Sequence, residues 1–191
     1  MNIINDKIKE GSWLDIHSTK FENLGKEGTW TWVSRKGNTP AVVIAAIILD
    51  DDNRTPFKNN KLIVTKEYRI PLFGYEYALP AGLMDKDESI EETTKRELLE
   101  ETGYSVKNII SISPFVYSSS GLTNESISIV MVEVDKNKRE SQRLESTEDI
   151  TVFSLNKREI RELMNKAKQK QIMISAKAWL IYDHFSRYNF L

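Results

Sequence analysis

Three glutamates on one predicted helix are the residues in this chain best placed to do chemistry. Glu97, Glu100 and Glu101 lie in the segment 82–104, GLMDKDESIEETTKRELLEETGY. At about 100° per residue, Glu101 lies about 40° and Glu100 about 60° from Glu97 around a helix. Like charges on one stripe repel, so this stripe needs solvent, a cationic partner or a metal ion. The bland alternative is a solvated acidic helix face.

Capping residues set the ends of this helix. Ser89 followed three residues later by Glu92 is a capping box, which predicts that the helix begins near Ile90. Gly103 is expected to end it, because glycine adopts the left-handed conformation after a helix without strain. A glycine-containing loop therefore leads into a short helix that carries the carboxylates.

Composition excludes several other kinds of chemistry. The chain has 191 residues, 27 basic and 28 acidic side chains and a net charge of −1, so charge gives no case for a nucleic-acid or membrane partner. It has no cysteine, which excludes thiolate chemistry and suits the reducing cytoplasm. Its two histidines, His17 and His184, lie far apart in sequence. The apolar run 41–49 is about half the length that spans a bilayer. Any catalysis must therefore rest on carboxylates.

The remaining segments predict a mixed sheet between helices. Strand patterns occur as two strands within 11–35 around a Gly25–Gly28 turn, and over 41–49, 61–68, 74–79, 105–118, 126–134 and 150–155. Helical periodicity covers 157–168 and 174–187. The segments between them are expected to be loops at 50–60 and 118–125 and a charged, mobile stretch at 135–149.

The spacing of residues in 82–104 resembles the Nudix box of the Nudix hydrolases. The matching positions are Gly82, Glu88, Arg96-Glu97-Leu98, Glu100-Glu101 and Gly103. Segments outside the box, such as TWTWVSRKG, EYRIPLFGYEYALPAGLMD, GLTNESISIV and TEDITVFSL, look like the branch that hydrolyses ADP-ribose and related nucleoside-diphosphate sugars. The resemblance implies an α/β fold (α+β), the α/β/α sandwich with a mixed β-sheet. It divides the chain into an N-terminal β-region, 1–39, swapped across a homodimer, and a Nudix hydrolase domain, 40–191.

The resemblance also implies Mg²⁺-dependent (or Mn²⁺-dependent) hydrolysis of a pyrophosphate bond, giving AMP and ribose 5-phosphate if ADP-ribose is the substrate. By analogy, the metal ligands are the Ala81 carbonyl, Glu97, Glu100 and Glu101. These oxygen ligands suit Mg²⁺, and divalent ions neutralise the polyanionic substrate. Glu88 and Arg96 are expected to pair and to hold the loop against the helix.

The general base is left open between glutamates outside the helix. The resemblance favours Glu148, with Glu125 as the second candidate, Glu145 within reach, and Glu100 a catalytic carboxylate as well as a ligand. A lone glutamate in a charged loop is usually just solvated.

Three residues are predicted to contact the substrate. Arg69 would hold a phosphate by charge-assisted hydrogen bonds. Trp30 corresponds to a family tryptophan that stacks on adenine, and Arg35 to an arginine near the same base. The structural alternatives are a surface role for Arg69 and core or dimer packing for Trp30 and Trp32.

Two departures from the family pattern leave the substrate open. Ser120 stands where ADP-ribose hydrolases usually have a proline, and Ala78 where a glutamate often precedes the Leu-Pro-Ala-Gly turn. One alternative is therefore a pyrophosphatase for another nucleoside diphosphate derivative. The other is a Nudix domain that senses a ligand without cleaving it, which the intact set of glutamates argues against.

Overall fold

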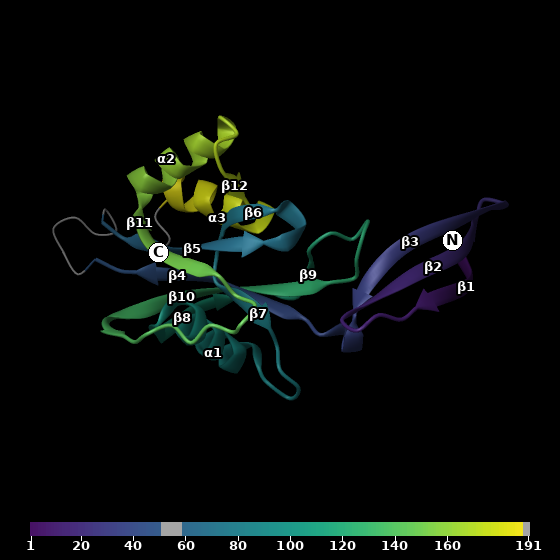
Figure 1. Ribbon diagram of the computed structural model, residues 1–191, viewed down its shortest axis with the longest axis horizontal. Helices are drawn as coiled ribbons and strands as arrows, with labels where there is room; N and C mark the ends of the chain where they lie inside the picture. The colour runs from purple at the N-terminus through teal and green to yellow at the C-terminus, as the bar shows by residue number, and fades with distance from the viewer. Residues whose placement is uncertain (51–58, 189–191) are drawn as a thin grey trace.

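Over the residues that it describes, the computed structural model shows two β-sheets and three α-helices (Figure 1). The structure describes residues 1–50 and 59–188, so most of the loop predicted at 50–60 lies outside the described residues. None of the helices within these ranges is long and apolar enough to cross a membrane.

The larger sheet has nine strands and is mixed, as predicted. Its main order is β12-β6-β5-β4-β10-β8, with β11 beside β5, β7 beside β4 and β9 beside β10. The β4–β10 and β6–β12 pairs are parallel and the others are antiparallel. The strands are β4 (Ala41–Ile48), β5 (Lys61–Arg69), β6 (Gly74–Ala78), β7 (Ala81–Leu83), β8 (Tyr104–Ile112), β9 (Val116–Tyr117), β10 (Ser126–Arg139), β11 (Ile150–Asn156) and β12 (Met173–Ile174).

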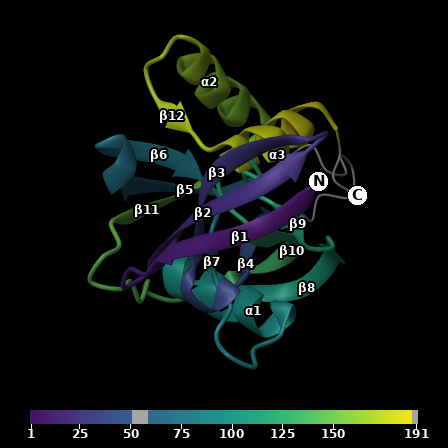
Figure 2. The ribbon, with the colours of Figure 1, turned by 90° about the vertical axis from the view of Figure 1, so that its right-hand side faces the viewer.

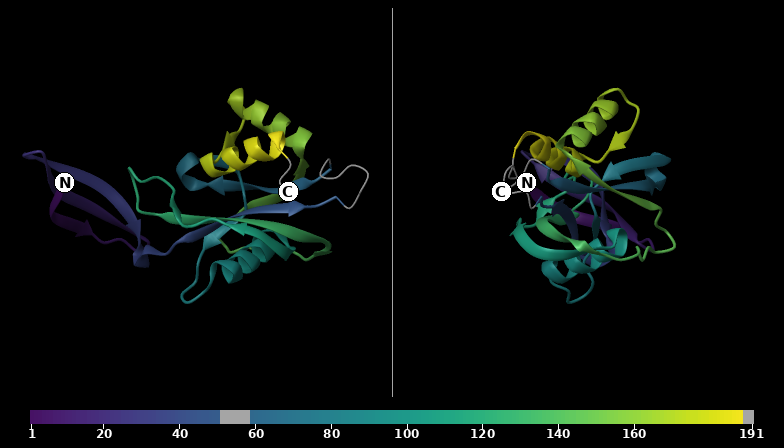
Figure 3. Two further views of the ribbon diagram at one scale, coloured as in Figure 1. Left: turned by 180° about the vertical axis from the view of Figure 1, so that it is seen from behind. Right: turned by 90° about the vertical axis from the view of Figure 1, so that its left-hand side faces the viewer.

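Helices cover both faces of this sheet, which confirms the predicted α/β/α sandwich. Helix α1 (Ile90–Thr102) lies on one face, and α2 (Lys157–Lys168) and α3 (Ala176–Arg187) lie on the other (Figures 1 and 3). The apolar strand β4 contributes side chains to the hydrophobic core on both faces of the sheet. Ile44 packs with Leu98 of α1, whereas Ile47 packs with Phe185 of α3. A strand buried on both faces explains the continuous apolar run.

The smaller sheet is N-terminal and projects from the end of the sandwich (Figures 1 and 2). It contains β1 (Asn2–Lys9), β2 (Leu14–Asn23) and β3 (Lys26–Arg35). Leu24 and Gly25 both have positive φ, 52° and 73°, in the hairpin between β2 and β3, as a two-residue hairpin turn requires. Strand β1 was not predicted, because its residues are polar or exposed throughout and only pairing with β2 defines it.

Two further segments differ from prediction. The strand expected over 105–118 is divided into β8 and β9 around Pro114, whose missing N–H cannot join a strand ladder. The stretch 135–149 is not simply a charged loop, since β10 continues to Arg139. Beyond it, backbone N–H groups donate from Glu140 to the Gly103 carbonyl at 2.8 Å and from Arg143 to the Glu100 carbonyl at 2.8 Å.

Candidate active site

The loop and helix of the box begin and end as their sequence predicts. At the start of α1, the Ser89 side chain accepts from the Glu92 N–H at 3.2 Å, and the Glu92 carboxylate accepts from the Ser89 N–H at 2.9 Å. At the end, Gly103 has φ 74° and donates to the Leu99 carbonyl at 2.9 Å. Local hydrogen bonds thus fix which residues of α1 face the sheet.

Arg96 fastens the loop to the helix. Its Nε and Nη2 atoms donate to the two carboxylate oxygens of Glu88 at 2.9 and 2.8 Å, and Nη2 also donates to the Leu83 carbonyl at 2.9 Å. This paired geometry confirms the expected Glu88–Arg96 contact. Hydrogen bonds from Arg96 lower the pKa of Glu88 to about 2, so the pair is ionised over the whole physiological range.

The same arginine reaches the predicted metal ligands. Its Nη1 atom lies 2.7 Å from Oε1 of Glu97 and 3.4 Å from Oε2 of Glu100. Glu101 is on the neighbouring side of α1, where Oε2 accepts from the Ala81 N–H at 3.1 Å. The helix therefore presents its carboxylates to β7, with a single guanidinium between three of the glutamates.

Burial makes two of these glutamates electrostatically unusual. Glu97 and Glu101 are 9% and 5% exposed. Burial raises the pKa of Glu97, although Arg96 opposes the shift, and the charges of Glu100 and Glu148 raise it further. Burial raises the pKa of Glu101 well above the usual range, although a hydrogen bond from the Ala81 N–H acts to lower it. Both carboxylates thus lie in a dry, negative environment that favours a bound cation.

Strand β5 adds a carboxylate, Glu67, that was not predicted from the sequence. Burial raises the pKa of Glu67, which the charge of Arg69 opposes and that of Glu148 reinforces. Arg69 is close to Glu67 and lies 3.6 Å from a carboxylate oxygen of Glu76. The charge of Glu67 also raises the pKa of Glu101. Because side chains alternate along a strand, Glu67 lies on the same face of β5 as Arg69, which was predicted to contact the substrate. This alternation is the sequence pattern from which Glu67 could have been predicted.

Glu148 belongs to the same cluster. Its charge acts on Glu67, Glu97 and Glu101. One of its carboxylate oxygens accepts from the Glu145 N–H at 2.8 Å, so the base candidates 145 and 148 share one turn. The side chain of Gln142 joins this segment to the helix, since Nε2 donates to the carbonyls of Glu101 at 2.6 Å and Ile150 at 3.2 Å. We call residues 67, 97, 100, 101 and 148 the acidic cluster.

The donor set of the acidic cluster fits a hard divalent cation. Its atoms are carboxylate oxygens, two of them from buried glutamates, and Arg96 and Arg69 are the cations in contact with it. In residues 1–50 and 59–188, no three acidic or imidazole side chains already surround one point in a way that would hold an ion. Part of the reason is that the Arg96 guanidinium is ion-paired with the Glu97 carboxylate, which would otherwise be available to a cation. A cation would compete with Arg96 for that carboxylate.

Glu125 lies elsewhere, at the junction between the two sheets. Its Oε1 accepts from Nε of Arg35 at 2.9 Å, its Oε2 accepts from the Ser118 hydroxyl at 2.7 Å, and Lys177 is 3.9 Å away. Burial raises the pKa of Glu125, but the hydrogen bonds from Ser118 and Arg35 outweigh it and the net pKa is lowered. Glu125 is therefore an ionised junction residue, and the structure brings Glu148 rather than Glu125 to the acidic cluster.

Trp30 lies at the same junction. Its indole N–H donates to the Gly121 carbonyl at 3.1 Å, and the neighbouring Val33 N–H donates to the Leu122 carbonyl at 2.9 Å. Trp32 instead stacks on His17 with ring centroids 3.8 Å apart and donates to Thr19 at 2.8 Å. Trp30 is thus the more available tryptophan, with 53% of it exposed.

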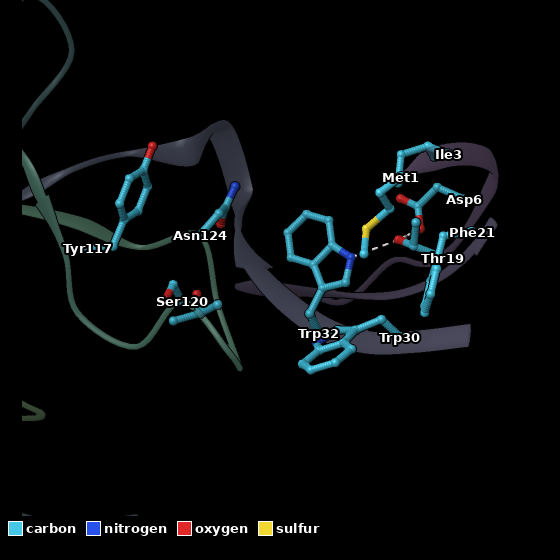
Figure 4. A pocket seen from close by; sticks show the side chains of 11 residues that line it. Met1, Ile3, Asp6, Thr19, Phe21, Trp30, Trp32, Tyr117, Ser120 and Asn124 are labelled. Atoms are coloured by element: carbon cyan, nitrogen blue, oxygen red, sulfur yellow. Dashed lines mark hydrogen bonds between the residues drawn. The ribbon is translucent and has the colours of Figure 1, made fainter. Parts of the chain in front are cut away.

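A largely apolar pocket of about 570 Å³ separates the N-terminal sheet from the 117–124 loop (Figure 4). Trp30, Trp32 and Phe21 line it from the sheet, and Tyr117 and Ser120 from the loop. Of the predicted substrate contacts, Trp30 and Arg35 lie at this junction, whereas Arg69 lies beside Glu67 of the acidic cluster. Within one chain, the predicted substrate-binding residues therefore form two groups, one at the junction of the two sheets and one beside the acidic cluster.

The mixed sandwich and its loop–helix with buried glutamates define a Nudix-type domain. A family model described as NUDIX domain matches residues 39–175. The chain is 34% identical over 182 residues to an ADP-ribose pyrophosphatase of Saccharomyces cerevisiae, covering 89% of this chain and 77% of the relative. The chain belongs to the Nudix hydrolases, as the box resemblance implied.

A second relative and a solved structure are also similar to this chain. An ADP-ribose pyrophosphatase of Bacillus subtilis is 33% identical over 154 residues, covering 80% of this chain and 76% of the relative. A solved structure of an ADP compounds hydrolase superposes with a TM-score of 0.64 at 20% identity, covering 86% of this chain and 82% of that one. The structural likeness supports the fold.

Proposed function

We propose that the protein hydrolyses the pyrophosphate bond of ADP-ribose or a related nucleoside-diphosphate sugar, giving AMP (or another nucleoside monophosphate) and a sugar phosphate. The observation that carries this proposal is the acidic cluster: buried Glu97 and Glu101 share one negative field with Glu148. Relatives named as ADP-ribose pyrophosphatases support the substrate class. Water attacks one phosphorus, and the bond from that phosphorus to the bridging oxygen breaks.

Residues in and around the acidic cluster have separate roles in this reaction. The Ala81 carbonyl, Glu97, Glu100 and Glu101 would hold Mg²⁺ or Mn²⁺, which neutralises substrate charge and activates water when bound. Glu148 takes the proton of the attacking water as general base. Arg69 binds a phosphate oxygen, and the Glu88–Arg96 pair keeps the loop against α1.

The nucleoside end of the substrate would contact Trp30 and Arg35. These two residues lie on the N-terminal sheet, away from Arg69 in the same chain. One face of that sheet carries exposed apolar side chains, including Ile3 (64% exposed) and Ile8 (56% exposed), in register with Phe21 and His17. We therefore propose a homodimer in which the region 1–39 brings Trp30 to the partner's acidic cluster, with 40–191 as the catalytic domain. The absence of cysteine suits a cytoplasmic enzyme.

Turnover of ADP-ribose tests the hydrolase proposal directly. Purified protein with Mg²⁺ should release AMP, and EDTA should abolish the release. Glu101→Gln should remove most activity while keeping the fold, and near-normal turnover by that variant would refute the metal assignment. A panel of other nucleoside-diphosphate sugars and dinucleotides defines the preferred substrate. If no compound in the panel is cleaved, the hydrolase proposal fails and a ligand-sensing role replaces it. A monomeric mass in solution would refute the homodimer.

A further inference from the structure

A second pocket lies on the face of the main sheet opposite the acidic cluster. It has a volume of about 490 Å³, and residues of β5, of β6 and of the segment that joins α2 to β12 line it. Its lining includes Lys66, Tyr75, Tyr77, Lys170 and Gln171. A cavity of this size is in the range that binds small molecules.

Strand register gives this pocket its chemistry. Lys66 pairs with Tyr77 across the β5–β6 ladder, and cross-strand partners project from the same face. Glu67 pairs with Glu76 in the same ladder, and alternation turns both carboxylates to the acidic face. The sheet thus separates an acidic face from a pocket of lysines and tyrosines.

Both pocket lysines are available to an anion. The Lys66 ammonium lies 4.3 Å from the centroid of the Tyr75 ring, a cation–π contact that positions it at the pocket wall. Among the residues whose structure is described, neither Lys66 nor Lys170 has a carboxylate within ion-pair distance. Two ammonium groups beside one cavity repel each other, and an anion between them relieves that repulsion.

The backbone holds Lys170 in a conformation that favours glycine. Its φ is 58°, and it follows the C-cap of α2. Its N–H donates to the Ala167 carbonyl at 2.9 Å, while the Gln171 N–H donates to the Lys166 carbonyl at 3.0 Å. This is a Schellman motif, and lysine occupies the position that glycine usually takes. A strained residue that carries a cation into a pocket is a reason to look for a ligand there.

We propose that this pocket binds a phosphate group attached to an aromatic ring, the chemistry of a nucleoside monophosphate. Lys66 and Lys170 neutralise the phosphate by charge-assisted hydrogen bonds. The ring packs against Tyr75 or Tyr77, and the Gln171 side-chain amide can donate to or accept from its polar edge. The site is separate from the acidic cluster and needs no divalent cation.

One hydrogen bond connects the pocket with the segment that carries Glu148. The Tyr75 hydroxyl donates to Oδ2 of Asp149 at 2.6 Å. Asp149 immediately precedes β11 in the sequence, and its neighbour Glu148 belongs to the acidic cluster on the opposite face of the sheet. A ligand packed on Tyr75 therefore contacts the residue that positions this segment. This connection rests on the proposed function, whereas binding at the pocket does not.

Calorimetric titration with AMP in EDTA tests the site. The double variant Lys66→Gln with Lys170→Gly should lose affinity at one site by roughly a hundredfold, about tenfold for each charge removed. Lys168→Gln, on the last turn of α2 outside the pocket lining, is the charge-matched control and should bind as the unmodified protein does. Thermal unfolding of each variant first establishes that it is folded.

Two comparisons make the result decisive. Arg69→Gln alters the acidic face and should leave the pocket affinity unchanged. If AMP binding is lost only in Arg69→Gln, or is equal in all variants, the pocket proposal is wrong and the hydrolase proposal stands. Inorganic phosphate and adenosine are titrated in parallel. AMP should bind more tightly than either one, and phosphate binding as tightly as AMP would refute the aromatic part of the proposal.

Discussion

Gly82 lies directly against the carboxylate of Glu97. A Cβ built on Gly82 would be 1.9 Å from Cδ of Glu97 and 2.0 Å from Oε1. The glycine of the box is therefore required by close packing, because any side chain at this position would displace a predicted metal ligand. Strand β7 holds the loop in place, since Gly82 pairs with Val42 of β4.

Gly82→Ala should reduce turnover much more than it reduces stability. Moving a catalytic carboxylate by about 1 Å can cost about a hundredfold in rate, whereas overpacking costs about 1–3 kcal/mol. Steady-state kinetics with ADP-ribose and thermal unfolding measure the two effects. Gly121→Ala is the matched control, because a Cβ there meets no atom within 4 Å. Equal turnover in the two variants would contradict the importance of the Gly82–Glu97 contact.

The parts of the site that sequence predicts are those fixed by local contacts. The capping box, the end of α1 at Gly103 and the Glu88–Arg96 pair depend on residues within one loop and one helix. The position of Glu67 in the acidic cluster was missed because it depends on how β5, α1 and β11 meet, which no single segment specifies. Strand β1 was missed for the same reason, since its exposed residues gain their structure from pairing with β2.

Glu88→Gln should destabilise the fold in a pH-dependent way. In the folded protein Arg96 lowers the pKa of Glu88 from 4.5 to about 2. A lowered folded-state pKa adds stability above pH 4.5, and this contribution is lost as the pH falls toward 2. The variant should therefore lose about 1–3 kcal/mol at pH 7, and its difference from the unmodified protein should shrink below pH 4.5.

Urea unfolding at pH 7, 4 and 3 measures that difference. Glu91→Gln changes an exposed glutamate in the first turn of the same helix and serves as the control. A difference for Glu88→Gln that stays constant from pH 7 to pH 3 would show that the Arg96 contact does not set the stability of the loop.

Glu148→Gln and Glu125→Gln should separate the two candidates for the general base. Loss of a general base lowers kcat by roughly 10²–10⁴-fold, and Glu148 is the candidate whose charge reaches Glu97 and Glu101. Glu125→Gln breaks the junction contacts to Arg35 and Lys177 and should change KM more than kcat. Rates at saturating ADP-ribose decide between them. A larger loss of kcat in Glu125→Gln would reverse the assignment.

Lys170→Gly should stabilise the protein while weakening the lysine–tyrosine pocket. Glycine adopts the observed φ of 58° without the strain of a Cβ, so the free energy of unfolding should rise by about 1 kcal/mol. Thermal and urea unfolding give this value, and Lys168→Gly inside the last turn of α2 should be destabilised instead. A Lys170→Gly variant less stable than the parent would mean that the lysine side chain supports the fold.

Trp30→Leu should raise KM for ADP-ribose without lowering kcat. Stacking on a nucleobase contributes about 1–3 kcal/mol, which corresponds to a KM increase of roughly 5- to 150-fold. Trp30→Phe keeps an aromatic face but removes the indole N–H that donates to the Gly121 carbonyl. If Trp30 contacts the base, Phe should restore most of the affinity. If its role is to fasten the N-terminal sheet to the 118–125 loop, Leu and Phe should impair the enzyme equally, and light scattering should show whether the dimer is lost in both.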